Sequence, residues 1–378
     1  MAGIYVHIPF CASRCSYCDF FSTLSLKEAG DAYVRALIAE ARLRRGELQG
    51  EPVKTLYMGG GTPSQLPLPL LEQLVTGLKG VLDLGGVEEF TVEANPDDVT
   101  PEWCATLSPL GVNRVSMGVQ SFEDVILRAI GRRHNAVQAV QAVNNLRSAG
   151  IGNVSIDLIY GLPGQTLASW ESSVNQALDL HPQHISAYGL TYEEGTRLWL
   201  QRERGEVKEV PEDVCVEMYR LLVARLREAG YEHYEISNFA LPDYYSRHNS
   251  SYWDETPYLG LGAAAHSFDG SVRRSNPCDL RGYLERIHRG EPACESEEMT
   301  WWERYDERVM LGLRTARGVD VKRLGADFGE QALLHFTREA QRHIAQGNLR
   351  VVDAIRYVLT DEGIILSDSL IRDLMWDG

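Results

Sequence analysis

The chain has 378 residues, of which 44% are hydrophobic and 24% are charged, and its formal net charge is -16. This length predicts two or three soluble globular domains, and the acidic balance argues against nucleic-acid binding, because phosphate contacts need clustered Lys and Arg. The chain shows no apolar run long enough to span a membrane and no secretory signal, so we expect a cytoplasmic protein without an integral membrane segment.

The first predicted element is a β-branched and aromatic strand over residues 3–8, which leads into a cysteine loop. Cys11, Cys15 and Cys18 have the spacing C-x3-C-x2-C, and the next cysteine is Cys104. A structural zinc site takes four N or S ligands. A [4Fe-4S] cluster held by three cysteines instead leaves one iron open for a small molecule. The spacing therefore predicts such a cluster, and the alternative is three buried or zinc-bound cysteines.

Strands and helices alternate over residues 1–230. After the first strand, further strands are predicted at 53–58, 87–92, 112–119, 154–160 and 184–190. Helices are predicted at 27–47, 66–81, 101–108, 122–130, 136–148, 167–180 and 213–229. Six such units predict a parallel α/β sheet, in the form of a partial (β/α)6 TIM-like barrel. Unusual polar residues recur at the C-terminal ends of these strands, where barrels of this class carry their sites.

After residue 230 the alternation stops. Residues 231–298 are predicted as an irregular, aromatic and Gly-rich connecting segment. Residues 299–378 are predicted as helices, a hairpin over 349–359 and a final helix, which is a winged-helix-like order. This third domain has 11 basic and 13 acidic side chains. A wing that reads DNA is normally basic, so the slight excess of acidic side chains favours a role for this domain as a lid or as a protein-contact surface.

Five motifs join the cysteine loop in resembling a known family. They read Y-V-H-I-P-F at 5–10, Y-M-G-G-G-T-P at 57–63, E-A-N-P at 93–96, G-V-Q-S-F at 118–122 and D-L-I-Y-G-L-P at 157–163. Over essentially the whole chain they resemble the HemN-like family of the radical S-adenosylmethionine (SAM) superfamily, and its heme-chaperone branch most closely. The resemblance implies a radical SAM core followed by a HemN-type C-terminal domain.

The same resemblance implies the cofactor residues. In the family, the three cysteines hold the cluster, SAM chelates its open iron, and an electron from the cluster breaks the sulfonium to give a 5′-deoxyadenosyl radical. The matching cofactor positions are Tyr5, Tyr17, Gly60, Gly61, Thr62 and Glu93. Gln120, Arg132 and Asp157 match positions that contact a second SAM, or its equivalent space, in the oxidase relatives. The alternatives are a core aromatic at Tyr5, a generic turn at the glycines and surface charges at Glu93 and Arg132.

The connecting segment carries the pattern H-N-x-x-Y-W at residues 248–253. It matches a motif associated with heme binding in the chaperone branch, which implies heme contacts by His248, Tyr252 and Trp253. His is a natural axial ligand of heme iron, and flanking aromatic rings can pack on the macrocycle. The alternative is a structural corner, with His248 hydrogen-bonded and Trp253 in the core.

Two departures separate the chain from the oxidases of this family. Those enzymes continue the loop as C-x3-C-x2-C-x-C, where this chain has Phe20, and they carry an N-terminal extension, whereas this chain starts four residues before Tyr5. Both favour a heme chaperone that passes heme to an acceptor protein and needs an electron donor for its cluster. No catalytic residue is assigned, and enzymatic activity is not expected. The alternatives are an oxygen-independent coproporphyrinogen III oxidase, which turns two propionates into vinyl groups, or a radical SAM enzyme with another substrate.

Overall fold

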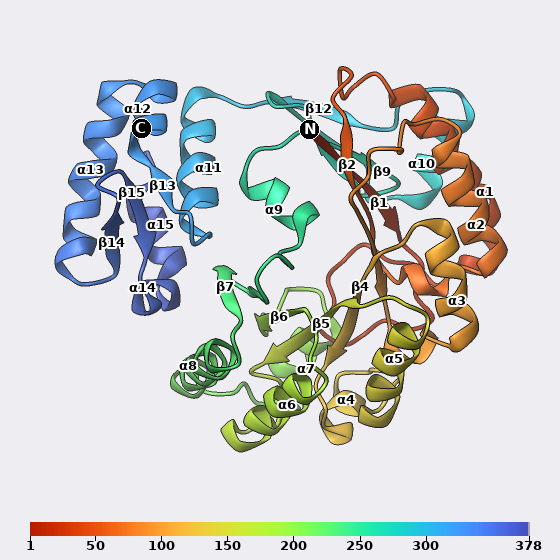
Figure 1. The fold of residues 1–378 in the computed structure, drawn as a ribbon, viewed down its shortest axis with the longest axis horizontal. Coiled ribbons are helices and arrows are strands. Elements are labelled where there is room, and N and C mark those ends of the chain that lie inside the picture. Colours follow the sequence, from red (N-terminus) through yellow and green to blue (C-terminus); the bar gives the residue numbers. More distant parts are fainter. Residues whose placement is uncertain (377–378) are drawn as a thin grey trace.

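A single twelve-stranded sheet forms the centre of the molecule in the computed structural model, which describes residues 1–376. Its strand order is β12-β11-β10-β9-β1-β2-β3-β4-β5-β6-β8-β7, and the successive strands from β1 to β6 are parallel. The bounds of these six are Ala2–Ile8, Val53–Gly60, Glu89–Ala94, Arg114–Gln120, Asn153–Tyr160 and His184–Gly189. The sheet curls without closing (Figure 1), which confirms the predicted α/β fold with a partial barrel.

Helices cover the outer face of this curved sheet (Figure 1). They are α1 (Leu26–Arg44), α2 (Leu68–Lys79), α3 (Pro101–Leu110), α4 (Asp124–Ala129), α5 (Ala136–Ser148), α6 (Leu167–Asp179) and α8 (Glu212–Glu228), with short 3-10 turns at Pro63–Gln65 and Pro96–Asp98. Along β1, Ile4, Val6 and Ile8 are fully buried. Because strand side chains alternate between faces, Tyr5 and His7 lie on the opposite face, in the hollow of the sheet.

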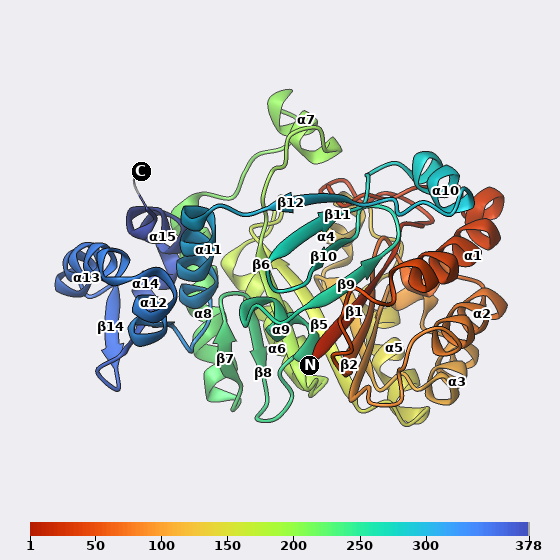
Figure 2. The same cartoon turned by 90° about the horizontal axis from the view of Figure 1, so that it is seen from above.

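One helix between β6 and α8 is absent from the predictions. Helix α7 (Arg197–Glu203) lies apart from the other helices on the rim side of the sheet (Figure 2). Its amide at Leu198 donates to the carbonyl of Ser16 at 2.7 Å, so this short helix is attached to the cysteine loop.

The segment 231–298, expected to be an irregular connection, supplies both edges of the sheet. Strands β7 (Glu232–Glu235) and β8 (Asn238–Ala240) extend it beyond β6, and β9 (Tyr258–Leu261), β10 (His266–Phe268), β11 (Val272–Ser275) and β12 (Glu295–Glu298) extend it beyond β1. These strands are too short for a readable alternation. At Gly260 a Cβ would lie 1.9 Å from the carbonyl oxygen of His266, so glycine permits the close approach of β9 and β10.

Two helices of the same segment pack on opposite sides of the sheet. Helix α9 (Arg247–Trp253) lies in its hollow, and α10 (Leu280–His288) lies beside α1 on the outside (Figure 1). The carboxylate of Glu89 accepts hydrogen bonds from the amides of Arg247 at 2.9 Å and His248 at 3.0 Å. A buried carboxylate on β3 thus satisfies the free N–H groups at the start of α9.

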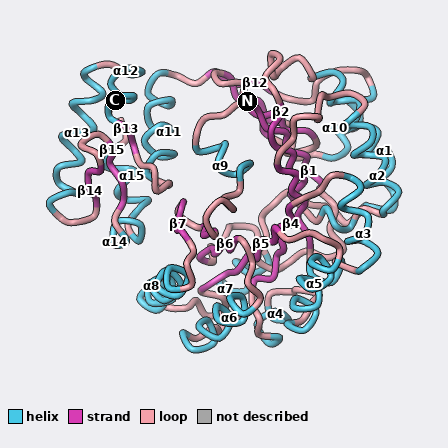
Figure 3. The backbone as a smooth tube through the Cα atoms, viewed as in Figure 1, coloured by secondary structure: helices cyan, strands magenta, loops and turns pink. Residues whose placement is uncertain are grey.

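The C-terminal domain has its own core and a winged-helix order of elements (Figure 3). These are α11 (Trp301–Leu313), β13 (Val319–Asp320), α12 (Val321–Phe328), α13 (Glu330–Ala345), β14 (Leu349–Val352), β15 (Arg356–Leu359), α14 (Asp361–Ile365) and α15 (Ser367–Leu374). The predicted hairpin over 349–359 is found as β14 and β15. The predicted final helix is divided into α14 and α15. No helix among residues 1–376 is long and apolar enough to cross a membrane.

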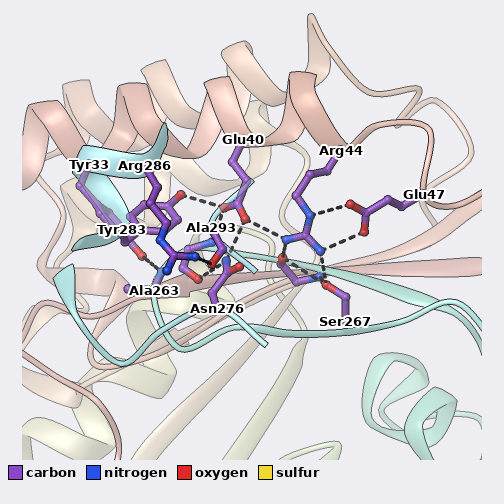
Figure 4. A network of polar contacts seen from close by, with 12 residues as sticks. Tyr33, Glu40, Arg44, Glu47, Ala263, Ser267, Asn276, Tyr283, Arg286 and Ala293 are labelled. Atoms are coloured by element: carbon purple, nitrogen blue, oxygen red, sulfur yellow. Dashed lines mark hydrogen bonds and ion pairs between the residues drawn. The ribbon is translucent and has the colours of Figure 1, made fainter. Parts of the chain in front are cut away.

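A buried polar network ties α1 to the β9–β10 edge of the sheet (Figure 4). The Glu40 carboxylate accepts from the amide of Gly262, the side chains of Asn276 and Tyr283, and Arg44, at 2.7–2.8 Å. Its side chain is 0% exposed, and that of Arg44 is 1% exposed. A buried charge pair is tolerated because other donors and acceptors satisfy both groups.

Candidate functional site

A cavity of about 430 Å³ opens at the C-terminal ends of the parallel strands. Every predicted cluster or SAM residue except Tyr5 lines it, namely Cys11, Cys15, Tyr17, Cys18, Gly60, Gly61, Thr62, Glu93, Gln120, Arg132 and Asp157. Its volume lies within the usual range for small-molecule sites. Residues from five different strand ends and from the cysteine loop are therefore brought together, as their positions in the sequence predict.

The cysteine loop is fixed at both of its ends by backbone hydrogen bonds. The amide of Cys11 donates to the carbonyl of Thr23 at 3.0 Å, and the amide of Thr23 donates to that of Pro9 at 2.6 Å. Midway, the amide of Ser16 donates to the carbonyl of Ile130 at 3.0 Å. The three thiols are thus presented by a loop that backbone hydrogen bonds hold at both ends and in the middle.

The thiols face the cavity without converging on one point. Among residues 1–376, no group of three or more His, Cys, Asp or Glu side chains is placed to hold a single metal ion. In an iron–sulfur cluster each cysteine binds a different iron, so the ligands are spread around a larger body. Burial raises the pKa of Cys18 to about 11, so this thiol stays protonated until a metal displaces the proton.

The glycine turn after β2 lines the cavity with backbone. Gly60 has φ +106, and a Cβ there would lie 2.4 Å from the His7 ring. A Cβ on Gly61 would lie 2.8 Å from the carbonyl oxygen of Ile8. Both positions require glycine, which leaves the backbone open to a ligand. The neighbouring Thr62 hydroxyl lies 3.3 Å from the Sγ of Cys11.

Two half-buried carboxylates face the cavity from β3 and β5. Glu93 accepts from the Tyr57 hydroxyl at 2.7 Å and from the amide of Gly60 at 3.1 Å. Burial raises the pKa of Glu93 to about 7, against the lowering effect of those hydrogen bonds. Asp157 accepts from the Ser116 hydroxyl at 3.2 Å, and burial raises the pKa of this carboxyl also. Such a pair suits a ligand that offers several hydrogen-bond donors or a positive charge.

Arg132 places a guanidinium between the carboxylates and the cysteine loop. It donates to the Sγ of Cys15 at 3.4 Å, to the Asn95 side chain at 2.6 Å and to the carbonyl of Gly118. Its buried Nε has no protein partner. Beside it, Gln120 has φ +68 at a bulge in β4, an uncommon backbone state for a residue other than glycine. Strain of this kind concentrates at ligand sites.

Tyr5 lies below the cavity and does not line it. Its hydroxyl hydrogen-bonds to the Nδ1 of His7 at 3.0 Å, and the Nε2 of His7 lies 3.0 Å from the carbonyl of Phe21. Since a carbonyl only accepts, Nε2 carries the proton and Nδ1 accepts from Tyr5. Tyr5 thus acts on the site through His7, which holds the end of the cysteine loop.

The H-N-x-x-Y-W motif forms α9, and its histidine is buried. The Nδ1 of His248 lies 2.8 Å from the Thr55 hydroxyl, and its Nε2 lies 2.8 Å from the Tyr252 hydroxyl. Burial, and then the charge of Arg114, lower the pKa of His248 to about 3, so the ring is neutral. Neither ring nitrogen is free for iron in this arrangement. Heme contact by His248, Tyr252 or Trp253 stays a prediction.

The site also contains residues that the motifs do not single out for a role. Asn95 accepts a hydrogen bond from the Arg132 guanidinium, and the Ser116 hydroxyl donates one to the Asp157 carboxylate. Tyr188, at the end of β6, lines the cavity with a 43% exposed ring. For Asn95 and Tyr188, the position at or directly after a strand end was the available signal, because that end of a parallel sheet carries the site. Ser116 lies inside β4, and no such signal marks it.

A parallel barrel-like core with a three-cysteine loop at its C-terminal rim defines a radical SAM protein by class. Residues 5–177 match the family model for the radical SAM superfamily, and residues 299–366 match that for the HemN C-terminal domain. In fold, the chain is similar to coproporphyrinogen III oxidase (HemN) from Escherichia coli, with a TM-score of 0.84 at 23% identity, over 99% of this chain and 90% of that one.

Curated relatives define the family more narrowly. The chain is 37% identical to the heme chaperone HemW of Lactococcus lactis, over 99% of this chain and 97% of that protein. It is 36% identical to the heme chaperone HemW of Bacillus subtilis, over 92% and 97% of the two chains. The chain belongs to the HemW group of the HemN-like family within the radical SAM superfamily.

Proposed function

We propose that this protein is a heme chaperone, which binds heme and passes it to an acceptor protein. A [4Fe-4S] cluster with exchangeable SAM regulates or promotes the transfer, and a separate electron donor reduces the cluster. Family membership supports the heme-chaperone assignment, because the relatives that match nearly the whole chain carry that name. A cytoplasmic location and the three-domain division at residues 230 and 298 stay predictions.

The residues of the rim cavity fit a cluster and one SAM. Cys11, Cys15 and Cys18 supply three thiolates, and a cluster held by three cysteines offers an open iron and an electron to SAM. The Arg132 guanidinium, with its unpartnered Nε, suits the SAM carboxylate. The Glu93 carboxylate suits the ammonium or the ribose hydroxyls of SAM. The glycine turn allows SAM to approach the backbone closely. We therefore assign these residues to cofactor binding.

One observation favours the chaperone over the oxidase. Where the oxidases carry a fourth loop cysteine, this chain has Phe20, whose side chain is 67% exposed at the edge of the cavity. A phenyl ring cannot replace the thiol that those enzymes carry at this position.

The proposal is tested anaerobically with the reconstituted protein, SAM and a reductant. Hemin and coproporphyrinogen III are offered separately, and we expect uptake of about one hemin per chain with no decarboxylation of the porphyrinogen. The measurements are the Soret absorbance of the bound heme and chromatography of the porphyrin products. Vinyl product formed over many turnovers would contradict the chaperone and support coproporphyrinogen oxidation.

SAM binding should depend on pH through Glu93. Its pKa of about 7 in the folded chain lies above the ordinary 4.5, so the carboxylate is mostly neutral at pH 6 and mostly charged at pH 8. We expect SAM affinity to rise about tenfold between these values, because only the charged form pairs with the ammonium. The stability of the unliganded chain should fall between about pH 4.5 and 7, where the folded state holds the proton and the unfolded state does not, and should change little above that range.

Calorimetric titration of SAM at pH 6, 7 and 8 checks this expectation. The Glu93→Gln variant serves as the matched control, because its amide keeps the size and loses the titration. We expect weaker binding with a flat pH profile for the variant. A wild-type profile that is itself flat would rule out Glu93 as the titrating group.

A further inference from the structure

Beneath the rim cavity, neighbouring strands present polar side chains to the hollow of the sheet. Along β4, Val115 and Met117 are fully buried in the apolar core. Because strand side chains alternate between faces, Arg114 and Ser116 point the other way, into the hollow. The same face carries Glu89, Thr91 and Glu93 on β3, and Ser155 and Asp157 on β5. Branched apolar side chains usually fill a barrel interior, so polar residues at this depth indicate a role beyond packing.

Arg114 places a positive charge in this hollow. The residue is 1% exposed and lies opposite Thr91 in the register of β3 and β4. Among residues 1–376, its only hydrogen bond runs from Nη1 to the Thr91 hydroxyl, at a long 3.5 Å, and its buried Nε has no partner. Burying a guanidinium with so few hydrogen bonds is costly, so the charges around it must stabilise it.

Two carboxylates of β3 flank Arg114 without forming a direct ion pair with it. Glu93 lies opposite Ser116, which makes it a diagonal neighbour of Arg114 on the same face of the sheet. Glu89 is the diagonal neighbour on the other side, and the two amides at the start of α9 already donate to its carboxylate. Glu93, which faces the cavity, is therefore the carboxylate whose charge can change when a ligand binds.

Glu93 and Asp157 repel each other when both are ionised. Burial raises the pKa of each carboxyl, and the charge of Asp157 raises that of Glu93 further. The Arg114 guanidinium acts against these effects and lowers both pKa values. A buried cation below the pair therefore favours the state in which both carboxylates are charged.

The tyrosines around these groups carry no compensating charge. Those that face Glu93 are Tyr5 on β1, Tyr57 on β2, Tyr188 on β6 and Tyr252 on α9, and Tyr234 on β7 faces Arg114. Burial raises the pKa of every one of these hydroxyls above its ordinary value. All five side chains are thus neutral at physiological pH.

The other basic groups nearby are neutral or bound elsewhere. His184 on β6 and His248 on α9 face Arg114, and burial, followed by the charge of Arg114, lowers the pKa of both imidazoles. At the rim, Arg132 is hydrogen-bonded to the cysteine loop and to β4. Arg114 is thus the cation that acts on Glu93 from inside the sheet.

We propose that Arg114 is a positioning residue for SAM, whose fixed charge beneath the cavity keeps the Glu93 carboxylate ionised beside Asp157. The inference rests on the proposed binding of SAM in the rim cavity and deepens it, because it assigns a residue that does not touch the ligand. A guanidinium stays protonated at every working pH, so this effect is permanent. The charged carboxylate is then ready to receive the ammonium of SAM.

SAM is titrated calorimetrically into the reconstituted full chain from pH 6 to pH 9. In Arg114→Met we expect the midpoint of the pH profile to rise by about one pH unit from its value near 7, because Glu93 loses its counter-charge. SAM affinity should then be about fivefold lower at pH 7 and nearly equal to that of the wild type at pH 9, where Glu93 is ionised in both. Arg114→Lys keeps the charge and should restore the wild-type midpoint. A residue needed only for packing would instead lower the affinity equally at every pH.

Arg114→Gln repeats the test with a side chain that keeps a hydrogen-bond donor, and Arg42→Met, on the exposed side of α1, is the matched control. Circular dichroism and iron content show that the variants are folded. If the two neutral variants of Arg114 keep the wild-type midpoint while Glu93→Gln flattens the profile, the inference is overturned and the SAM assignment stands. The inference also fails if Arg114→Met weakens SAM binding as much in the Glu93→Gln background as in the wild type. A wild-type chain that binds no SAM overturns both.

Discussion

The Cys15→Ser variant, reconstituted with iron and sulfide, should retain less than one iron per chain where the wild type holds about four. Serine keeps the size of the side chain but replaces a soft thiolate with a hydroxyl that is not ionised at neutral pH. The Cys15 Sγ also accepts from Arg132 at 3.4 Å, so the substitution changes the environment of the group that we assign to the SAM carboxylate. SAM binding should therefore be lost together with the cluster.

Iron and acid-labile sulfide analysis, with the visible absorbance of the cluster, measures this loss. The fold should survive, because the loop is held by backbone bonds at Cys11, Ser16 and Thr23 that the substitution does not touch. We therefore expect an unchanged circular dichroism spectrum. Cys278→Ser is the matched control, since its thiol is exposed and lies outside the cavity. Full iron content in Cys15→Ser would exclude Cys15 as a ligand.

The strand ends were predictable because two independent signals coincide there. The six parallel strands are short and mostly buried, and a polar or glycine motif lies at or directly after their ends. Parallel order brings those ends to one rim, so Glu93, Gln120 and Asp157 line one cavity although they lie far apart in the chain. Local pattern and topology together were enough to bring these residues to one cavity, whereas their assignment to SAM comes from the family resemblance and stays a prediction.

The rest was hidden because it depends on contacts between distant segments. Strand β9 can pair with β10 because Gly260 allows the two backbones to approach closely. A single glycine in a loop-like sequence does not predict a strand. The burial of His248 depends on Thr55, nearly two hundred residues earlier.

Replacing Arg44 by Met should lower the free energy of unfolding by about 3–5 kcal/mol. All five of its N–H donors are used: Nε and Nη2 donate to Glu47 at 2.8 and 2.9 Å, Nη1 donates to Glu40 and to the carbonyl of Gly260, and Nη2 also reaches Ser267 (Figure 4). Methionine fills the space but leaves the buried Glu40 carboxylate without its counter-charge. Urea unfolding of the metal-free protein measures the change.

The Arg35→Met variant on the same helix is the matched control. Arg35 pairs with Asp31 across one helical turn, but its side chain is 64% exposed, so its loss should cost less than about 1 kcal/mol. If the two variants unfold at the same urea concentration, the buried network contributes no more to the free energy of unfolding than a surface ion pair does.

The network should also matter for the cofactor, because it reaches the cysteine loop. The Tyr33 hydroxyl donates to the carbonyl of His7 at 2.9 Å and accepts from the amide of Ala263 at 3.0 Å. Loosening the β9–β10 edge in Arg44→Met therefore frees the strand end from which the loop starts. We expect this variant to bind its full iron at first and to lose it faster than the wild type under a chelator. If the variant loses iron at the same rate as the wild type, the network stabilises the fold but does not help to retain the cluster.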